Sequence, residues 1–214
     1  MVRPSRNLDQ ALLASGAALY PALGCAGLTV RAVAVHAGVT AGMFHYHFAS
    51  KEEFLRQVLQ GFYEDLFDQL SVSAAQPGSP LVRLRATLLR GARFLRDQAP
   101  LLQRVLVDAH AGEAVARDFL QRNLPRHIQL VLQLMDEGER AGELPPQPPL
   151  LRMTFLFGAV IAPLLAGSAL RDAGLVPALA VPLIEPQVLS DAAINRRIDL
   201  ALRALTQKGE NHAD

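Results

Sequence analysis

Apolar residues recur along this chain with the spacing of helices. One apolar face runs from Leu8 to Leu23 and stops at Gly24, and a second runs from residue 54 to residue 70 at intervals of four. This spacing places side chains on one side of a helix, whereas the sustained apolar–polar alternation of half-buried strands is not seen. The pattern therefore predicts an all-α fold. The second face consists of Phe54, Val58, Phe62, Leu66 and Leu70.

Residues 71–80 (SVSAAQPGSP) have the composition of a linker that follows the long amphipathic helix. Ser79 suits the N-cap of a further helix, and Pro80 suits its first turn because the missing N–H of proline is not needed there. We expect this helix to continue through about Asp97.

The rest of the chain is predicted to be helical between proline-containing connectors. Gly142 is expected to end one helix, the run 144–150 (LPPQPPL) cannot be helical, and 174–188 is expected to be an apolar loop. The predicted helices are a short one after Pro100, one from near Asn123 to Ala141, one over 150–173, and a last one capped by Ser190 that carries Ile194, Ile198, Leu202 and Leu205.

Composition fits this picture of a folded helical protein. Of the 214 residues, 50% are hydrophobic and 19% are charged, which is enough apolar material for a large core. Cys25 is the only cysteine, so no disulfide can form within the chain. The net charge of +1 points to no partner, but residues 1–51 carry four basic residues and one acidic residue. This local excess is a hint of an anion-binding N-terminal part.

The stretch Met153–Leu170 (MTFLFGAVIAPLLAGSAL) contains no charged residue. Its 18 residues make it a borderline membrane-spanning segment by length alone. The alternative is a helix buried inside the protein or between subunits, which Gly158 and Pro163 favour because they dilute its hydrophobicity. No secretory signal is expected, since Asp9 and Gln10 interrupt the N-terminal segment.

Residues 28–51 (LTVRAVAVHAGVTAGMFHYHFASK) have the pattern of two short helices joined by a tight turn. Thr29 and Thr40 suit the N-caps of the two helices. Between them, Gly38 permits the positive φ of the turn, small Ala34 allows the helices to cross closely, and Phe44 supplies an apolar plug beneath the second helix. Together these features predict a helix-turn-helix.

The run Gly27–Leu55 (GLTVRAVAVHAGVTAGMFHYHFASKEEFL) resembles the DNA-binding domain of the TetR family of bacterial transcription regulators, and the resemblance extends over about residues 8–70. It implies a three-helix DNA-binding domain at 1–50, joined by a connecting helix and linker at 51–77 to a larger helical effector-binding and dimerisation domain at 78–207, with a tail at 208–214. Phosphates and base edges of double-stranded DNA would be contacted by Thr29, Arg31, Thr40, Ala41, Gly42, Met43, His45, Tyr46, His47 and Lys51.

This sequence departs from the family at the first position of an aromatic pair, which is usually tyrosine and here is His45. Ala41, Gly42 and Met43 offer few hydrogen bonds to bases, so direct readout through hydrogen bonds is expected to be thin. Arg31 and His45 could supply it. The alternative is recognition of DNA shape, with Arg3 or Arg6 in a minor groove.

The resemblance further implies a cytoplasmic homodimer that acts as a ligand-responsive regulator, most often a repressor. Helices at about 150–173 and 190–206 would pair with their counterparts, which would account for the uncharged stretch without a membrane. A small, hydrophobic effector would lie in the second domain and shift the dimer away from the operator spacing. Candidate effector contacts are Phe94, His110, Phe119, Met135 and Phe155.

Other classes of function find little support in the sequence. An enzyme built on the helical domain would need a nucleophile–base set, and neither a P-loop nor a dinucleotide glycine motif is present. His45 and His47 point apart on a helix, and His110 with Glu113 is more often a solvated pair than a metal site, so no metal or cofactor is expected. We expect Cys25 to be a small buried hydrophobe, with a redox role as the alternative.

Overall fold

The computed structural model describes residues 5–207, with side chains from residue 8 onward, and these residues contain no strand. The prediction of an all-α fold is thereby confirmed. The chain forms two compact units: Met1–Asp65 with Pro100–Pro125, and Leu66–Ala99 with Arg126–Asp214. These units divide the predicted connecting segment 51–77 at residue 65 and join residues 100–125 to the N-terminal helices. The predicted tail at 208–214 and Arg3 lie outside the described residues, as does the side chain of Arg6.

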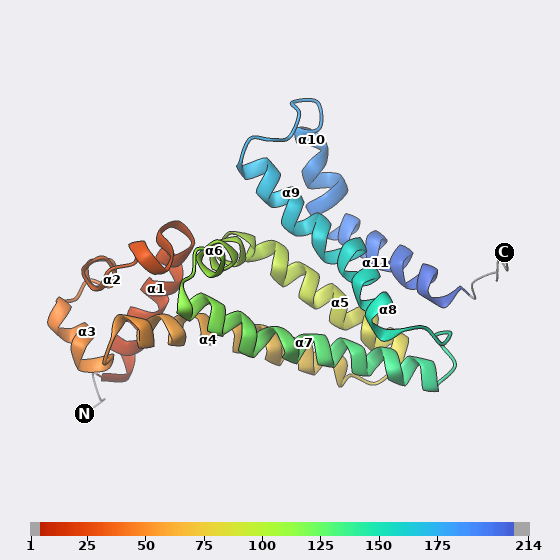
Figure 1. Ribbon diagram of the computed structural model, residues 1–214, viewed down its shortest axis with the longest axis horizontal. Coiled ribbons are helices and arrows are strands. Elements are labelled where there is room, and N and C mark those ends of the chain that lie inside the picture. Colours follow the sequence, from red (N-terminus) through yellow and green to blue (C-terminus); the bar gives the residue numbers. More distant parts are fainter. Residues whose placement is uncertain (1–4, 208–214) are drawn as a thin grey trace. The chain divides into compact units, whose positions relative to one another are not determined.

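The first unit gathers three N-terminal helices with parts of three later ones (Figure 1). Gly16 faces the ring of Phe54, and a Cβ at this position would lie 2.6 Å from the ring carbon Cζ. The absence of a side chain at residue 16 therefore allows the first and fourth helices to pack in direct contact. The helices are α1 (Ser5–Gly27), α2 (Val30–His36), α3 (Ala41–His47), the start of α4 (Lys51–Ala74), α6 (Ala99–His110) and the start of α7 (Ala114–Arg140).

The second unit has its own hydrophobic core, to which α5, α7 and the C-terminal helices contribute. Fully buried members include Leu84, Val160 and Ile194. The helices not yet named are α5 (Pro80–Asp97), α8 (Pro149–Leu156), the π-helical segment η1 (Phe157–Ile161), α9 (Ala162–Asp172), α10 (Val181–Ile184), the π-helical segment η2 (Glu185–Leu189) and α11 (Asp191–Thr206).

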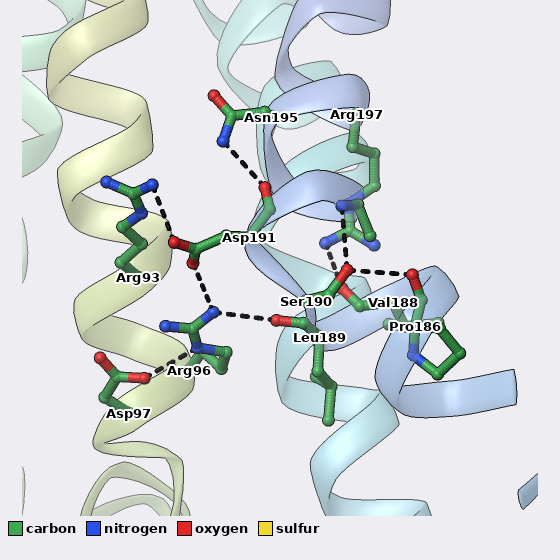
Figure 2. A network of polar contacts seen from close by, with 11 residues as sticks. Arg93, Arg96, Asp97, Pro186, Val188, Leu189, Ser190, Asp191, Asn195 and Arg197 are labelled. Carbon is green, nitrogen blue, oxygen red and sulfur yellow. Dashed lines mark hydrogen bonds and ion pairs between the residues drawn. The ribbon is translucent and has the colours of Figure 1, made fainter. Parts of the chain in front are cut away.

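Polar contacts hold the start of α11 against α5 within this unit (Figure 2). The carboxylate of Asp191 forms ion pairs with Arg93, at 2.9 Å, and with Arg96, at 2.7 Å. Arg96 also donates to the carbonyl of Leu189 at 3.0 Å. Arg96 thus contacts both the end of η2 and the beginning of α11.

Several helix ends fall where the sequence places them. The hydroxyl of Ser79 accepts from the N–H of Val82 at the start of α5, and that of Ser190 accepts from the N–H of Ala193 at the start of α11. Gly142 follows α7 with a φ of 73°, which confirms its role as the C-terminal stop.

Three predicted helix boundaries were wrong. Local helix-breaking signals were outweighed by tertiary contacts or by the tolerance of proline in the first turn of a helix. The helix expected from near Asn123 begins at Ala114 and passes through Pro125, and the amide of Asn123 is buried and bonded to Phe119 and Gln60. The expected linker is helical up to Ala74. The expected loop at 174–188 contains α10 and η2, and Pro182 lies in the first turn of α10, where the missing N–H costs nothing.

The uncharged stretch lies within the continuous helical segment Pro149–Asp172, which includes η1. Among the described residues, this is the one helix long and apolar enough to cross a membrane by length and composition. Only 22% of its most apolar 18-residue window is buried. Large apolar side chains of this segment, including Phe155 and Phe157, are exposed.

Candidate nucleic-acid interface

The turn between α2 and α3 is closed by backbone hydrogen bonds that require a glycine. Gly38 has a φ of 70°, its N–H donates to the carbonyl of Val35, and the N–H of Val39 donates to that of Ala34. This pair of bonds satisfies the last carbonyls of α2 and redirects the chain into α3. At the other end of α2, the Thr29 hydroxyl accepts from the N–H of Ala32 at 3.1 Å, so its predicted N-cap is confirmed.

Three aromatic rings fix α3 in place. The ring of Phe44 is fully buried and lies 5.3 Å from that of Phe48 and 5.0 Å from that of Phe54, measured between centroids. The rings of Phe48 and Phe54 are 4.9 Å apart. These distances are those of favourable aromatic pairs, so the buried side of the seven-residue helix is set by the side chain of Phe44.

The opposite side of α3 faces solvent. Successive helical residues are rotated by about 100°, which places Gly42 and Tyr46 away from Phe44 and puts Met43 and His45 on the flanks. Tyr46 is 76% exposed and Met43 is 39% exposed. Thr40 occupies the N-cap position as predicted, but its hydroxyl makes no capping hydrogen bond and is exposed. It therefore remains free to contact a ligand.

The other predicted contacts belong to the same unit. Thr29 and Arg31 are exposed at the start of α2. The ammonium of Lys51 donates to the carbonyl of Ala26 at 3.1 Å, which ties the start of α4 to the end of α1. His47 is half-buried, and its Nε2 atom has no hydrogen-bond partner among the described residues.

A buried aspartate, which sequence reasoning did not single out, braces the end of α1 just before this motif. Asp108 on α6 is 3% exposed. Its carboxylate accepts from the hydroxyl of Tyr20 at 2.8 Å, from the N–H of Cys25 at 2.7 Å and from Nε of Arg104 at 2.9 Å. Burial alone would raise the pKa of Asp108, but these hydrogen bonds and the Arg104 charge lower it below its usual value.

The same cluster determines the surroundings of the thiol of Cys25, the single cysteine. Cys25 is buried, as predicted, and burial raises its pKa to about 11. Its thiol lies 3.4 Å from the hydroxyl of Tyr20, whose pKa burial also raises. Gly24 has a φ of 63°, and a Cβ there would lie 1.9 Å from Nε of Arg104. The positive φ of Gly24 is the break in α1, and only the fold reveals that Arg104 is the neighbour of this glycine.

The predicted effector contacts are distributed over both units. In the first, His110 is exposed at the end of α6, and the Phe119 ring packs edge-on against that of Tyr63 at 6.1 Å. In the second, Met135 belongs to the core, Phe94 is half-buried and Phe155 is exposed. Their role therefore stays a prediction. The described residues contain no group of three potential metal ligands.

Comparison with known proteins agrees with the geometry of the motif. Residues 12–58 match the family model of the bacterial regulatory proteins of the tetR family. The transcriptional repressor KstR2 of Mycobacterium tuberculosis is 36% identical over 78 residues, which make up 36% of this chain and 39% of the repressor. The chain thus aligns with about two fifths of the length of that curated relative.

Solved structures share the fold over almost the whole chain. The ketosteroid transcriptional regulator KstR2 of M. tuberculosis has a TM-score of 0.63 at 21% identity, covering 94% of this chain and 95% of that one. The regulator FadR of Bacillus subtilis, solved with stearoyl-CoA, has a TM-score of 0.68 at 14% identity, covering 90% and 97%.

An N-terminal helix-turn-helix unit continued by a larger helical unit defines the class of one-component helix-turn-helix proteins. Within it, residues 12–58 of this chain match the TetR family, as the motif predicts.

The Asp108 cluster predicts how stability depends on pH. Asp108→Asn should lower the free energy of unfolding by about 1.5–3 kcal/mol at pH 7, because a buried charged acceptor is lost. A lowered folded-state pKa stabilises the protein above the unfolded value of about 3.9. The difference in the free energy of unfolding between variant and wild type should therefore vanish as the pH falls through the lower folded-state pKa of Asp108. Urea unfolding between pH 3 and 7 measures it.

Asp118→Asn is the matched control, since Asp118 forms only an exposed ion pair with Arg122 at 3.7 Å. It should change stability by less than about 0.5 kcal/mol at any of these pH values. Equal effects of the two variants at pH 7 would contradict the bracing role of Asp108.

Proposed function

We propose that this protein is a cytoplasmic transcriptional repressor that binds a near-palindromic DNA operator as a homodimer and is released by a small hydrophobic effector. The observation that carries the proposal is the solvent-facing side of α3. The Phe44 cluster buries the opposite side of this helix, which follows the turn at Gly38. A helix presented in this way fits the major groove of B-form DNA. The named repressors among the relatives support the direction of regulation.

Charge around this surface supports a phosphate-binding role. The described basic residues of the motif include Arg31 and Lys51. Glu52 and Glu53, the acidic residues nearby, lie in the first turn of α4, where they stabilise the helix dipole. Basic residues in the same motif as the exposed helix suit phosphate contacts beside a groove.

Uncovered apolar surface supports the homodimer. Large apolar side chains of the second unit are exposed along one stretch of sequence that includes the membrane-length helical segment. A second copy of the same chain would cover this surface, as in obligate dimers whose interfaces resemble a core. It would also supply the second recognition helix that a two-fold operator requires. The exposed side chains are Leu150, Leu151, Phe155, Phe157, Leu170, Leu175, Leu179, Val181 and Leu183.

The nature of the second unit supports a hydrophobic effector. Its core is built of aliphatic side chains with Met135 among them, and Phe94 lies partly buried on α5. A ligand with an acyl chain could be accommodated by rearrangement of such flexible side chains. FadR, which shares this fold, was solved with stearoyl-CoA, which makes that compound a suitable first probe.

Selection of bound sites from fragmented genomic DNA should yield a short sequence with two-fold symmetry. On that site, Arg31→Ala should lower affinity about tenfold and reduce the slope of log K against log salt by about one per subunit, because a phosphate contact is lost. Fluorescence anisotropy at several salt concentrations measures both. Arg122→Ala, which removes a 67% exposed arginine of α7 in the same unit, serves as control. An unchanged salt slope in Arg31→Ala would remove Arg31 from the interface.

The dimer is tested by a charge placed in the apolar surface. Leu151→Glu should dissociate the protein into monomers and lower operator affinity at least tenfold, because burying an unpaired carboxylate at an interface is costly. Val82→Glu changes a residue of similar exposure (58% against 57%) on α5 and should remain dimeric. Sedimentation velocity at micromolar concentration distinguishes them. A monomeric wild type, or one recovered only in detergent, would contradict the proposal.

The effector is tested with stearoyl-CoA. Saturating ligand should weaken operator binding about 5- to 150-fold, the usual range of allosteric coupling between two sites. It should also raise the melting temperature, because a ligand that binds the folded state stabilises it. Coenzyme A without the acyl chain is the control and should do neither. Unchanged operator affinity at saturating stearoyl-CoA would contradict an acyl-chain effector.

A further inference from the structure

We propose that the recognition helix α3 selects its operator chiefly through the 5-methyl groups of thymine, which pack against Met43 and Ala41. This inference rests on the proposed function, since it concerns how the same surface distinguishes one DNA sequence from another. It names the base that lies opposite α3, which neither the fold nor the family specifies.

The exposed part of α3 is mostly apolar at the end that enters a groove first. Ala41, Gly42 and Met43 are consecutive, all three are exposed, and none carries a hydrogen-bonding side chain. The polar side chains of α3 follow one turn later, beginning at His45. A helix inserted by its N-terminal residues therefore presents methyl and thioether groups to the bases, while the later polar residues lie nearer the backbone.

Gly42 brings these apolar groups close to the base edges. A Cβ at residue 42 would lie in open space, with the hydroxyl oxygen of Thr40 as its nearest neighbour at 3.9 Å. The glycine is thus not required by packing within the unit. Its effect is that no side chain projects from the exposed face in the first turn of α3, one turn before Tyr46, so the helix backbone can approach the groove floor there and the flanking Ala41 and Met43 can reach it.

The chemistry of the major groove then limits what these side chains can read. Acceptors and donors on guanine, cytosine and adenine would be desolvated without a partner beneath an apolar side chain, which is unfavourable. The one apolar group displayed in the groove is the methyl group of thymine. Base pairs opposite Met43 and Ala41 should therefore be T·A pairs, with Thr40 free to add a hydrogen bond at their edge.

Replacement of thymine by uracil in the selected operator tests this inference, because it removes the methyl group and leaves base pairing intact. Each thymine of a half-site is replaced in turn, and affinity is measured by fluorescence anisotropy with the full-length protein. We expect one or two positions per half-site to lose about fourfold in affinity, the effect of burying one methyl-sized group. In Met43→Ala the loss at the position facing Met43 should disappear.

Val72→Ala is the matched control, because it shortens another exposed apolar side chain outside the motif, and it should keep the full sensitivity to uracil. A symmetric operator whose affinity is unaffected by uracil at every position would overturn the inference while leaving the proposed function intact. The same holds for a selected site that lacks thymine in its half-sites. If no symmetric site is selected at all, the proposed function fails and this inference fails with it.

Discussion

The ring of Phe44 is the element on which the recognition surface depends. It is the one fully buried side chain of a seven-residue helix, and its partners Phe48 and Phe54 come from the following loop and from α4. A helix this short has little stability of its own in water, so its direction is decided by packing. Because Phe44 points inward, Gly42 and Tyr46 must point outward, and the flanking positions of Met43 and His45 follow from the helical rotation. A change that loosened this ring would alter every contact the helix could make.

A second constraint is polar. The end of α1 breaks at Gly24, only a few residues before α2, and the carboxylate of Asp108 accepts the N–H group of Cys25 next to this break. An orphan N–H buried without a partner would cost on the order of 1–3 kcal/mol, so the aspartate stabilises an otherwise unfavourable chain path. Since Asp108 belongs to α6, this helix forms one compact unit with the helices of the helix-turn-helix. Movements of α6 would therefore reach the motif directly, whereas α5 and α8–α11 belong to the other unit.

The second unit poses a different physical problem, which is an excess of apolar surface. Its helices share one core, yet only 22% of the most apolar window of Pro149–Asp172 is buried by the chain. A lipid bilayer and a second subunit would both cover such a segment. The ion pairs that fix α11 against α5, together with Ser190 at its N-cap, hold a neighbouring helix in a defined position within the unit (Figure 2). A preorganised face of this kind is what a subunit interface needs, and it underlies the proposal of a dimer.

The sequence by itself determined the helical class, the helix-turn-helix and most helix ends, because these depend on local signals: apolar periodicity, the caps Thr29, Ser79 and Ser190, and the positive φ of Gly38 and Gly142. It failed where a distant neighbour decides. The helix that contains Pro125 was expected to begin near Asn123, but the buried amide of Asn123 and its bonds to α4 hold α7 intact there. The roles of Tyr20, Arg104 and Asp108 could not be predicted either, since residues more than 80 positions apart meet only after folding. Likewise, periodicity shows that Met153–Leu170 is apolar, but only the tertiary structure shows how little of that surface the chain itself can bury.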